Sequence, residues 1–269
     1  MLPAVGSECG YAVGAPGSDV KPDQLRDCSI ALLEARVDLI SPAGPVLPNV
    51  IIVLTDDQRW DTIDATHESP VRPGPVMPNV TSELVEQGVL FTNAFVTNSL
   101  CCPSRSSILR GQYSHTTGIH TNRPPNGGAE DFTNNGLDTA TLATWLHAAG
   151  YKTGLYGKYL NGYQNLWAPP ALSYVPPGWD EWHAFEMTDY YDYNLAEFGA
   201  GIPTPELNPY PSGCTNYQGC PADEVGEDPC PDPQNYSTDV LVAKALDFID
   251  QSAGQPFFLY FAPFAPHGP

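Results

Sequence analysis

Two adjacent cysteines, followed by a proline, a serine and an arginine, are the residues of this sequence best suited to chemistry. They lie in the stretch SLCCPSRSSILRG, residues 99–111. Adjacent cysteines rarely bond to each other, because the peptide that joins them is too short for relaxed disulfide geometry. If Pro103 lies in the first turn of a helix, Cys101 and Cys102 lie at its positive end, where a thiolate is favoured and anions are attracted. Arg105 would then lie one turn further along and could hold an oxyanion.

Two familiar thiol chemistries do not fit this stretch. A thiol phosphatase loop has an arginine six positions after its cysteine, but Ser107 follows Cys101 and Ile108 follows Cys102 at that spacing. A cysteine protease needs a histidine and an asparagine at the same site, and nothing in the sequence ties such a pair to these thiols. The residues alone also permit a structural interpretation, in which two small apolar side chains are buried at a helix start.

A pair of carboxylates follows a short apolar run. Residues 49–54, NVIIVL, are rich in β-branched side chains and predict a strand buried on both faces. Asp56 and Asp57 come directly after it, and ligands of open α/β sheets collect at the carboxyl ends of strands. Adjacent acids are costly unless they are solvated or neutralised, and a hard cation such as Ca²⁺ neutralises them well. The alternative interpretation is a solvated turn with two ordinary surface acids.

The elements that must position these side chains alternate between strands and helices. Helices are predicted at 78–87, 103–110 and 139–149, and from Ser237, which would cap a helix with Leu241, Ala245, Phe248 and Ile249 on one face. Strands are predicted at 49–54, 89–96, 151–157 and at the start of 256–269, whereas 169–234 is expected to be mostly loop. This order predicts an α/β domain with a mostly parallel central sheet flanked by helices.

The two ends of the chain carry different signals. Residues 1–47 show no clear periodicity apart from a possible helix at 29–37, so we expect an irregular N-terminal segment there. Residues 48–269 form the α/β domain. Because the chain ends a few residues beyond a strand that looks central, we expect that the remainder of a larger domain is absent.

The composition limits the class of partner. The chain has 11 Lys and Arg against 31 Asp and Glu, a formal net charge of −20. Such a chain repels nucleic acid and anionic membrane surfaces at long range, so an anionic substrate must be attracted by a few local cations. No apolar run approaches the roughly 20 residues that a membrane span needs. We therefore expect no nucleic-acid partner and no membrane span.

The cysteines bear on the compartment. Their number, seven, is odd, so at least one stays unpaired if the others form disulfides. Cys214, Cys220 and Cys230 lie in a Pro-, Gly- and Asp-rich stretch that we expect to be a surface loop, where a disulfide would be useful outside the cell. We therefore expect a secreted, periplasmic or lysosomal-like protein, although no signal peptide is visible in this chain.

Residues 101–105, CCPSR, resemble the C-x-P-S-R signature of the type I sulfatases. Further stretches agree with that family in order and spacing: PNVIIVLTDDQ, MPNVTSELVEQGVLFTNAFV, GLYGKYLNGY, VPPGWDEWHAF, and YSTDVLVAKALDFI with PFFLYFAPFAPHGP. Within the family, GKYLN and PPGWDEW resemble the N-acetylglucosamine-6-sulfatase and related heparan-type branch. The resemblance covers most of residues 48–269.

The resemblance implies the fold and the centre of the site. It implies an alkaline-phosphatase-like α/β fold, with residues 48–269 as the N-terminal part of the catalytic domain. In this family, the cysteine two positions before the proline and four before the arginine is oxidised to Cα-formylglycine, which selects Cys101. The resemblance also implies that Asp56, Asp57 and the modified Cys101 bind Ca²⁺, and that Arg105 holds the formylglycine hydrate.

Further roles follow from the same resemblance. Lys158, in GKYLN, would pair with a sulfate oxygen, and His267, in APHGP, would bind sulfate and donate a proton to the leaving alcohol. Many sulfatases have a histidine two positions after the lysine, where this chain has Leu160. Asn161 would stand in as the polar neighbour that contacts substrate.

The implied activity is hydrolysis of a sulfate ester, on a sulfated small molecule or sugar of the glycosaminoglycan type. Maturation would need a formylglycine-generating enzyme as partner. The family places further Ca²⁺ ligands downstream of Pro269, so we do not expect the isolated chain to be active. The alternatives are a phosphoesterase or phosphonate hydrolase of the same superfamily, or an inactive fragment.

Overall fold

The computed structural model describes four stretches of the chain: residues 47–63, 76–167, 174–211 and 233–268. Its contacts divide the chain into two units, Met1–Leu47 and Pro48–Pro269. The possible helix at 29–37 lies outside the described residues, as do Cys214, Cys220 and Cys230.

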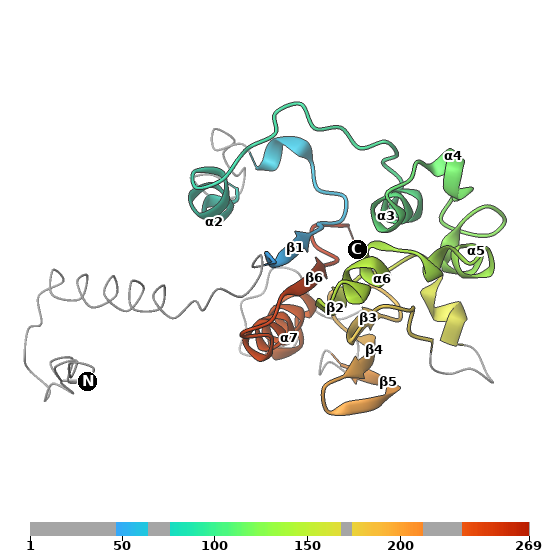
Figure 1. Cartoon of the computed structure of the whole chain (residues 1–269). Helices are drawn as coiled ribbons and strands as arrows, with labels where there is room; N and C mark the ends of the chain where they lie inside the picture. Colours follow the sequence, from blue (N-terminus) through green and yellow to red (C-terminus); the bar gives the residue numbers. More distant parts are fainter. Residues whose placement is uncertain (1–46, 64–75, 168–173, 212–232, 269) are drawn as a thin grey trace, which may run out of the picture. The chain divides into compact units, whose positions relative to one another are not determined.

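A six-stranded mixed sheet forms the centre of the unit Pro48–Pro269 (Figure 1). In spatial order its strands are β1 (Val50–Val53), β6 (Phe257–Ala262), β2 (Lys152–Gly157), β3 (Glu181–Phe185), β4 (Tyr193–Gly199) and β5 (Ile202–Tyr210). The first four strands pair in parallel, and β4 and β5 extend the sheet in antiparallel fashion. The predicted α/β class with a mostly parallel sheet is therefore confirmed.

Strand β6 shows why a continuous apolar run forms the middle of this sheet. Phe258 and Tyr260 point into one hydrophobic cluster, and Phe257 and Leu259 point into the other. Successive side chains of a strand alternate between faces, so a strand covered on both sides must be apolar throughout. The predicted buried strand at the start of 256–269 is confirmed.

Helices cover both faces of the sheet. On one side, α7 (Ser237–Gln251) packs against β2 and β6 with Leu241, Ala245 and Phe248 buried, as predicted. On the other side lie α3 (Cys101–Arg110), α5 (Gly128–Asn134) and α6 (Leu142–Ala148). The predicted cap of α7 is wrong: the N-cap residue is Tyr236, Ser237 is already helical, and its hydroxyl has no hydrogen-bond partner among the described residues.

Shorter helices complete the described part of the chain. They are the 3-10 turns η1 (Trp60–Thr62), η3 (Leu137–Thr139), η4 (Tyr163–Trp167) and η6 (Pro233–Asn235), the helices α2 (Pro78–Val80) and α4 (Ser114–Thr117), and the π-helical turn η2 (Thr81–Val85). The helix predicted at 78–87 corresponds to α2 and η2. Helix α3 ends as predicted at Gly111, which adopts a left-handed φ of 60°.

Within 169–234, where the sequence predicted mostly loop, the described residues include the strands β3, β4 and β5, which were not predicted. Strand β5 carries Pro203, Pro205 and Pro209, and proline inside an apolar run argues against a strand. Here β5 is the outermost strand and pairs only with β4. A proline on such an edge strand can direct its missing N–H away from the partner, so the ladder survives.

Two further predictions failed at the opposite edge. Strand β1 pairs only with β6, and although Val50 and Ile52 pack on the core, Ile51 is 50% and Val53 61% exposed, so β1 is not buried on both faces. Residues 89–96 form no strand, and Phe95 is 87% exposed. Apolar composition favours a strand only where another edge pairs with it, and no described strand pairs with this segment.

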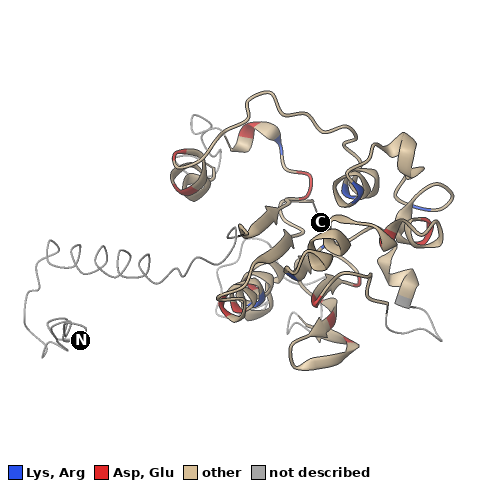
Figure 2. Cartoon of the chain, viewed as in Figure 1, with Lys and Arg blue, Asp and Glu red and all other residues tan. Residues whose placement is uncertain are grey.

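Charged residues are spread over several elements. Figure 2 shows acidic residues on α5 and α7, and basic residues on α3 and α7. Across the part of the chain that the structure describes, no helix combines the length and the apolar character that crossing a membrane requires.

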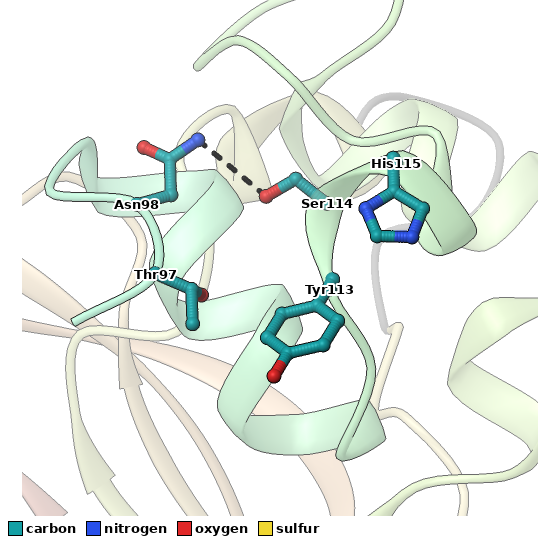
Figure 3. Close-up of a pocket in the computed structure, with 5 residues that line it drawn as sticks. All are labelled: Thr97, Asn98, Tyr113, Ser114 and His115. Carbon is teal, nitrogen blue, oxygen red and sulfur yellow. Dashed lines mark hydrogen bonds between the residues drawn. The ribbon is translucent and has the colours of Figure 1, made fainter. Parts of the chain in front are cut away.

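The segment that leads into α3 is held against α4. Asn98 Nδ2 donates to Ser114 Oγ at 3.4 Å, and Asn98 Oδ1 accepts from the backbone N–H of Leu100 at 2.9 Å (Figure 3). A cavity of about 370 Å³ opens here, lined by Thr97, Asn98, Tyr113, Ser114 and His115. These bonds fix the direction in which the chain enters α3, and therefore where the first residues of α3 lie.

Candidate active site

Asp56 and Asp57 lie in the turn that leaves β1, and they face different surroundings. The backbone N–H of Leu54 donates to Phe261 O at 2.8 Å, and that of Asp56 to Ala265 O at 3.2 Å, so the turn follows the end of β6. Asp57 has a left-handed φ of 54°, which aspartate tolerates better than most residues. Asp56 is only 3% exposed, whereas the Asp57 side chain is 54% exposed.

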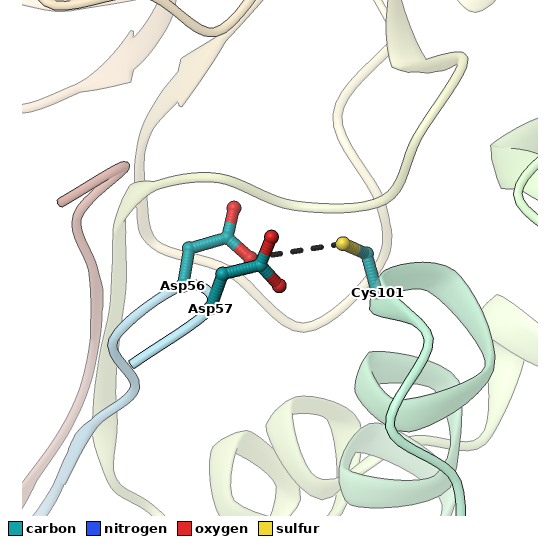
Figure 4. Close-up of side chains that lie close together, drawn as sticks. All are labelled: Asp56, Asp57 and Cys101. Atoms are coloured by element: carbon teal, nitrogen blue, oxygen red, sulfur yellow. Dashed lines mark hydrogen bonds between the residues drawn. The ribbon is translucent and has the colours of Figure 1, made fainter. Parts of the chain in front are cut away.

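Cys101 is the first residue of α3 and faces this pair of acids (Figure 4). Its sulfur lies 3.7 Å from Asp56 Oδ1. One ligand atom each from Asp56, Asp57 and Cys101 lie within 4.8 Å of one another. The sheet edge and the helix N-terminus therefore bring Cys101 to an acid that lies 45 residues before it in the sequence.

Two cations neutralise the buried carboxylate. Lys158 Nζ donates to Asp56 Oδ2 and lies 3.6 Å from Cys101 Sγ. Arg105 Nη2 lies 3.6 Å from Asp56 Oδ1, and Arg105 Nη1 donates to the Lys158 carbonyl at 2.7 Å. All of these charged side chains are at least nine-tenths buried.

Gly157 explains how Lys158 reaches the site. It ends β2 with φ 116°, and a Cβ there would lie 2.0 Å from the Ala262 carbonyl oxygen. The next N–H, that of Lys158, donates to the same carbonyl at 2.7 Å. Only glycine permits this close approach of β2 to β6 at that conformation. The glycine before the lysine therefore sets the point at which the lysine leaves the sheet.

His267 lies in the loop after β6, on the far side of Asp57. Its Nε2 is 3.3 Å from Asp57 Oδ2, and its Nδ1 is 2.5 Å from the carbonyl oxygen of Gly268. The imidazole stacks on Phe264, with ring centroids 4.7 Å apart. Both ring nitrogens thus face oxygen atoms.

Cys102 and Asn161 lie away from this cluster. Cys102 is fully buried, and burial raises the pKa of its thiol, although backbone hydrogen bonds from Gly128 and Asn161 oppose that shift. A buried thiol with a raised pKa is unreactive. The Asn161 side-chain oxygen has no hydrogen-bond partner among the described residues. These contacts lie beside Cys102, and none of the hydrogen bonds described for Asn161 reaches Asp56, Asp57 or Cys101.

Two residues that support the site, Asn122 and Tyr190, were not predicted from the sequence. Asn122 Oδ1 accepts from the backbone N–H of Cys102 at 2.9 Å and so satisfies one free donor in the first turn of α3. The Tyr190 hydroxyl donates to the carbonyl of His267 at 2.8 Å. Neither residue has a spacing signal in the sequence, because each reaches the site from a separate loop.

The donor set suits a hard divalent cation in part. Two carboxylates offer the oxygen ligands that Ca²⁺ prefers, whereas a thiolate is a soft ligand. Replacing the Cys101 sulfur by oxygen would make the set uniform. Three side chains still provide only part of the six to eight oxygens that Ca²⁺ usually takes.

Residues 48–269 match the family model described as Sulfatase. A putative extracellular sulfatase Sulf-1 homolog of Caenorhabditis elegans is 34% identical over 226 residues, covering 82% of this chain and 26% of that protein. The N-acetylglucosamine-6-sulfatase of Homo sapiens is 34% identical over 233 residues, covering 84% of this chain and 36% of that protein.

Solved structures give a similar picture. The structure of BT4656 in complex with its substrate, D-glucosamine-2-N,6-O-disulfate, matches with a TM-score of 0.53 and 25% identity, over 82% of this chain and 35% of that chain. The crystal structure of Ps i-CgsB matches in fold, with a TM-score of 0.52, 24% identity and coverage of 82% and 46%. The chain spans only 26% of the length of the Caenorhabditis elegans relative and 36% of that of the Homo sapiens relative.

Proposed function

The chain belongs to the sulfatase family, and we propose that it forms the N-terminal part of an enzyme that hydrolyses a sulfate ester of a sugar. One observation carries the proposal. Asp56, Lys158 and Cys101 converge at the start of α3, with the sulfur 3.7 Å from a carboxylate oxygen and 3.6 Å from an ammonium nitrogen. This cluster combines a nucleophile position, metal-type ligands and cations in one place.

Cys101 is proposed as the position of the nucleophile, after oxidation to Cα-formylglycine. The hydrated aldehyde would supply two hydroxyls on one carbon, one to attack sulfur and one whose deprotonation releases sulfate. Cys101 rather than Cys102 is supported by exposure, because Cys101 is half-buried beside the acids and Cys102 is fully buried.

Asp56, Asp57 and the oxygen at position 101 are proposed to hold Ca²⁺. The cation would neutralise sulfate oxygens and lower the pKa of the nucleophilic hydroxyl. Lys158 and Arg105 would bind the sulfate and the hydrate, respectively, because both cations already face the Asp56 carboxylate beside Cys101. His267 would donate the proton that the departing alcohol needs, from Nε2 on the Asp57 side of the site.

The substrate class is proposed from the relatives. Two similar proteins are an N-acetylglucosamine-6-sulfatase and BT4656, whose structure holds its substrate D-glucosamine-2-N,6-O-disulfate. We infer that the substrate here is a sulfated sugar as well, and that a formylglycine-generating enzyme is the maturation partner. A location outside the cytoplasm is proposed on the same basis, since one relative is described as extracellular. Asn161 remains a proposed substrate neighbour.

The deciding experiment compares two esters of the same phenol. The complete protein that contains this chain is produced together with a formylglycine-generating enzyme, and turnover of an aryl sulfate and of the matching aryl phosphate is measured. Faster hydrolysis of the sulfate is expected. Faster hydrolysis of the phosphate would identify a phosphoesterase instead, and hydrolysis of neither aryl ester nor of a sugar sulfate would identify an inactive homologue.

A further inference from the structure

We propose that Tyr190 is a positioning residue that holds His267 in place to protonate the alcohol leaving the sulfate ester. The inference rests on the proposed function for the role of His267. Tyr190 itself touches neither the acids nor Cys101 in the described contacts. It acts through the backbone of His267, whose carbonyl accepts the Tyr190 hydroxyl at 2.8 Å across 77 residues of sequence.

Three aromatic residues from separate loops build the support. Tyr190 comes from the β3–β4 connection, Tyr236 precedes α7, and Phe264 follows β6. The ring centroids of Tyr190 and Tyr236 lie 5.7 Å apart with nearly parallel planes, and those of Tyr190 and Phe264 lie 5.0 Å apart. Phe264 in turn stacks on the His267 imidazole. Tyr190 therefore fixes both the backbone of His267 and the ring on which its imidazole rests.

Backbone bonds anchor Tyr190 itself. Its carbonyl accepts from the N–H of Ser237, the first residue of α7, at 3.0 Å. Its own N–H donates to Asp189 Oδ1 at 2.7 Å. Helix α7 packs on the central strands, so the Tyr190 hydroxyl is tied to the rigid part of the molecule. His267 lies in the loop beyond β6, where its N–H donates to the Phe264 carbonyl at 3.0 Å, and Tyr190 ties this loop to the β3–β4 connection.

The Tyr190 hydroxyl is suited to act as a permanent donor. Burial raises the pKa of Tyr190, and the neighbouring Tyr236, Asp56 and Asp189 raise it further. The phenol therefore keeps its proton through the pH range in which enzymes work, and it can always donate to the His267 carbonyl. In the imidazole ring of His267, Nδ1 faces the Gly268 carbonyl. Nε2 is therefore the ring nitrogen directed toward Asp57 and the site.

The contribution of Tyr190 to the rate should depend on how much the reaction needs the proton from His267. A general acid contributes about 10²- to 10⁴-fold, and a displacement of about 1 Å can cost much of that. An ester with a good leaving group, such as nitrophenol, needs little protonation. A sugar alcohol leaves poorly and needs the proton. If Tyr190 only positions His267, its removal should slow the hydrolysis of a sugar sulfate more than that of a nitrophenyl sulfate. General damage to the fold should slow both reactions equally.

The first test uses the chain of 269 residues itself and needs no activity. The ring signals of His267 are identified by NMR through their loss in His267→Gln. In the wild type, the stacked Phe264 ring should shift these signals away from their random-coil positions. Tyr190→Phe keeps the aromatic ring but removes the donor, and it should move them back toward random coil. Tyr236→Phe removes a hydroxyl from the neighbouring ring and should leave them unchanged. Unmoved signals in Tyr190→Phe would overturn the inference.

The second test measures hydrolysis by the complete, matured protein. Tyr190→Phe should lower kcat on a sugar sulfate by about tenfold or more, and kcat on nitrophenyl sulfate by less than about twofold. Tyr236→Phe should change neither. An active wild type in which Tyr190→Phe lowers both activities equally, or lowers neither, overturns the positioning role. A wild type that hydrolyses neither ester overturns the proposed function instead.

Discussion

The side-chain nitrogen of Lys158 lies 3.6 Å from the sulfur of Cys101 and at the same time donates to the carboxylate of Asp56. The three residues come from the ends of β2 and β1 and from the start of α3. A cation, an anion and a thiol in mutual contact and largely out of water form an arrangement with strong electrostatic coupling.

The two adjacent cysteines should behave differently. Cys101→Ala should abolish sulfate ester hydrolysis by the matured protein, whereas Cys102→Ala should retain it, because Cys102 is buried behind the site. In the wild type, the tryptic peptide that contains Cys101 should be about 18 Da lighter than its thiol form, since oxidation to the aldehyde exchanges sulfur for oxygen and removes two hydrogens. Peptide mass spectrometry and a turnover assay check both points. Activity in Cys101→Ala, or its loss in Cys102→Ala alone, would mean that the nucleophile lies elsewhere.

Asp57 should be required for Ca²⁺ binding but not for folding. Asparagine has nearly the same shape and also tolerates a left-handed φ, so Asp57→Asn should keep the melting temperature of the metal-free protein. Adding Ca²⁺ should raise the melting temperature of the matured wild type by mass action, and it should not raise that of Asp57→Asn.

Asp192→Asn is the matched control for this experiment. Asp192 is exposed and has the same φ of 54° as Asp57, but it lies in the β3–β4 connection. The control variant should respond to Ca²⁺ as the wild type does. Equal stabilisation of Asp57→Asn and the wild type by Ca²⁺ would remove Asp57 from the metal site.

Lys158 should contribute to stability through its buried partner. Lys158→Met keeps the unbranched side chain but removes the ammonium group, and it leaves Asp56 buried with Arg105 as its remaining ion pair. Breaking a buried pair on one side should lower the free energy of unfolding by about 3 kcal/mol. Urea unfolding measures the change. Arg59→Met removes a pair with Asp61 in which the arginine is 72% exposed, so it should cost at most about 1 kcal/mol. Similar losses in the two variants would contradict the buried geometry.

Glu197 should make the free energy of unfolding depend on pH in the acidic range. The carboxylate is 2% exposed on β4, with His183 Nδ1 and Lys244 Nζ each 2.8 Å away. Burial alone would raise the pKa of Glu197, but hydrogen bonds from His183 and Lys244 outweigh it and lower the pKa to about 2. A carboxylate whose pKa is lowered in the folded protein stabilises the fold at every pH above its ordinary pKa of 4.5. That contribution is lost as the pH falls from 4.5 toward 2.

The free energy of unfolding of Glu197→Gln should therefore fall below that of the wild type by up to about 3 kcal/mol at neutral pH. The gap should narrow between pH 4.5 and about 2. A series of urea titrations across this range gives the measurement. The exposed Glu206→Gln, on the neighbouring strand β5, should show only a small gap at every pH. A gap for Glu197→Gln that does not change with pH would exclude the charged state as its cause.

The sequence by itself determined the parts of the protein that depend on local pattern. The apolar run of β6 and the face of α7 with Leu241, Ala245 and Phe248 could be recognised because their periodicity is written in neighbouring residues. Gly111 at the end of α3 follows equally local rules. The signature around Cys101 and its resemblance to a family led to the family that the comparisons found.

Predictions from the sequence were wrong where a structure depends on residues distant in the sequence. Prolines argued against β5, although an edge position tolerates them, and β-branched residues favoured a strand at 89–96 that no described neighbour pairs with. The sequence order could not tell that β1 lies at an edge with Ile51 exposed. Strand neighbours are decided by pairing across the whole sheet, which no short window of sequence contains.

Only the tertiary structure decided how the site is assembled. Composition supplied the acids, the lysine and the histidine, but only the folded chain buries Asp56 and leaves the neighbouring Asp57 exposed. The bonds from Asn122 to the first turn of α3 and from Tyr190 to His267 join loops that are far apart in the sequence. Residue type fixes what a side chain can do, whereas its charge state, partners and reach depend on neighbours that only folding brings close.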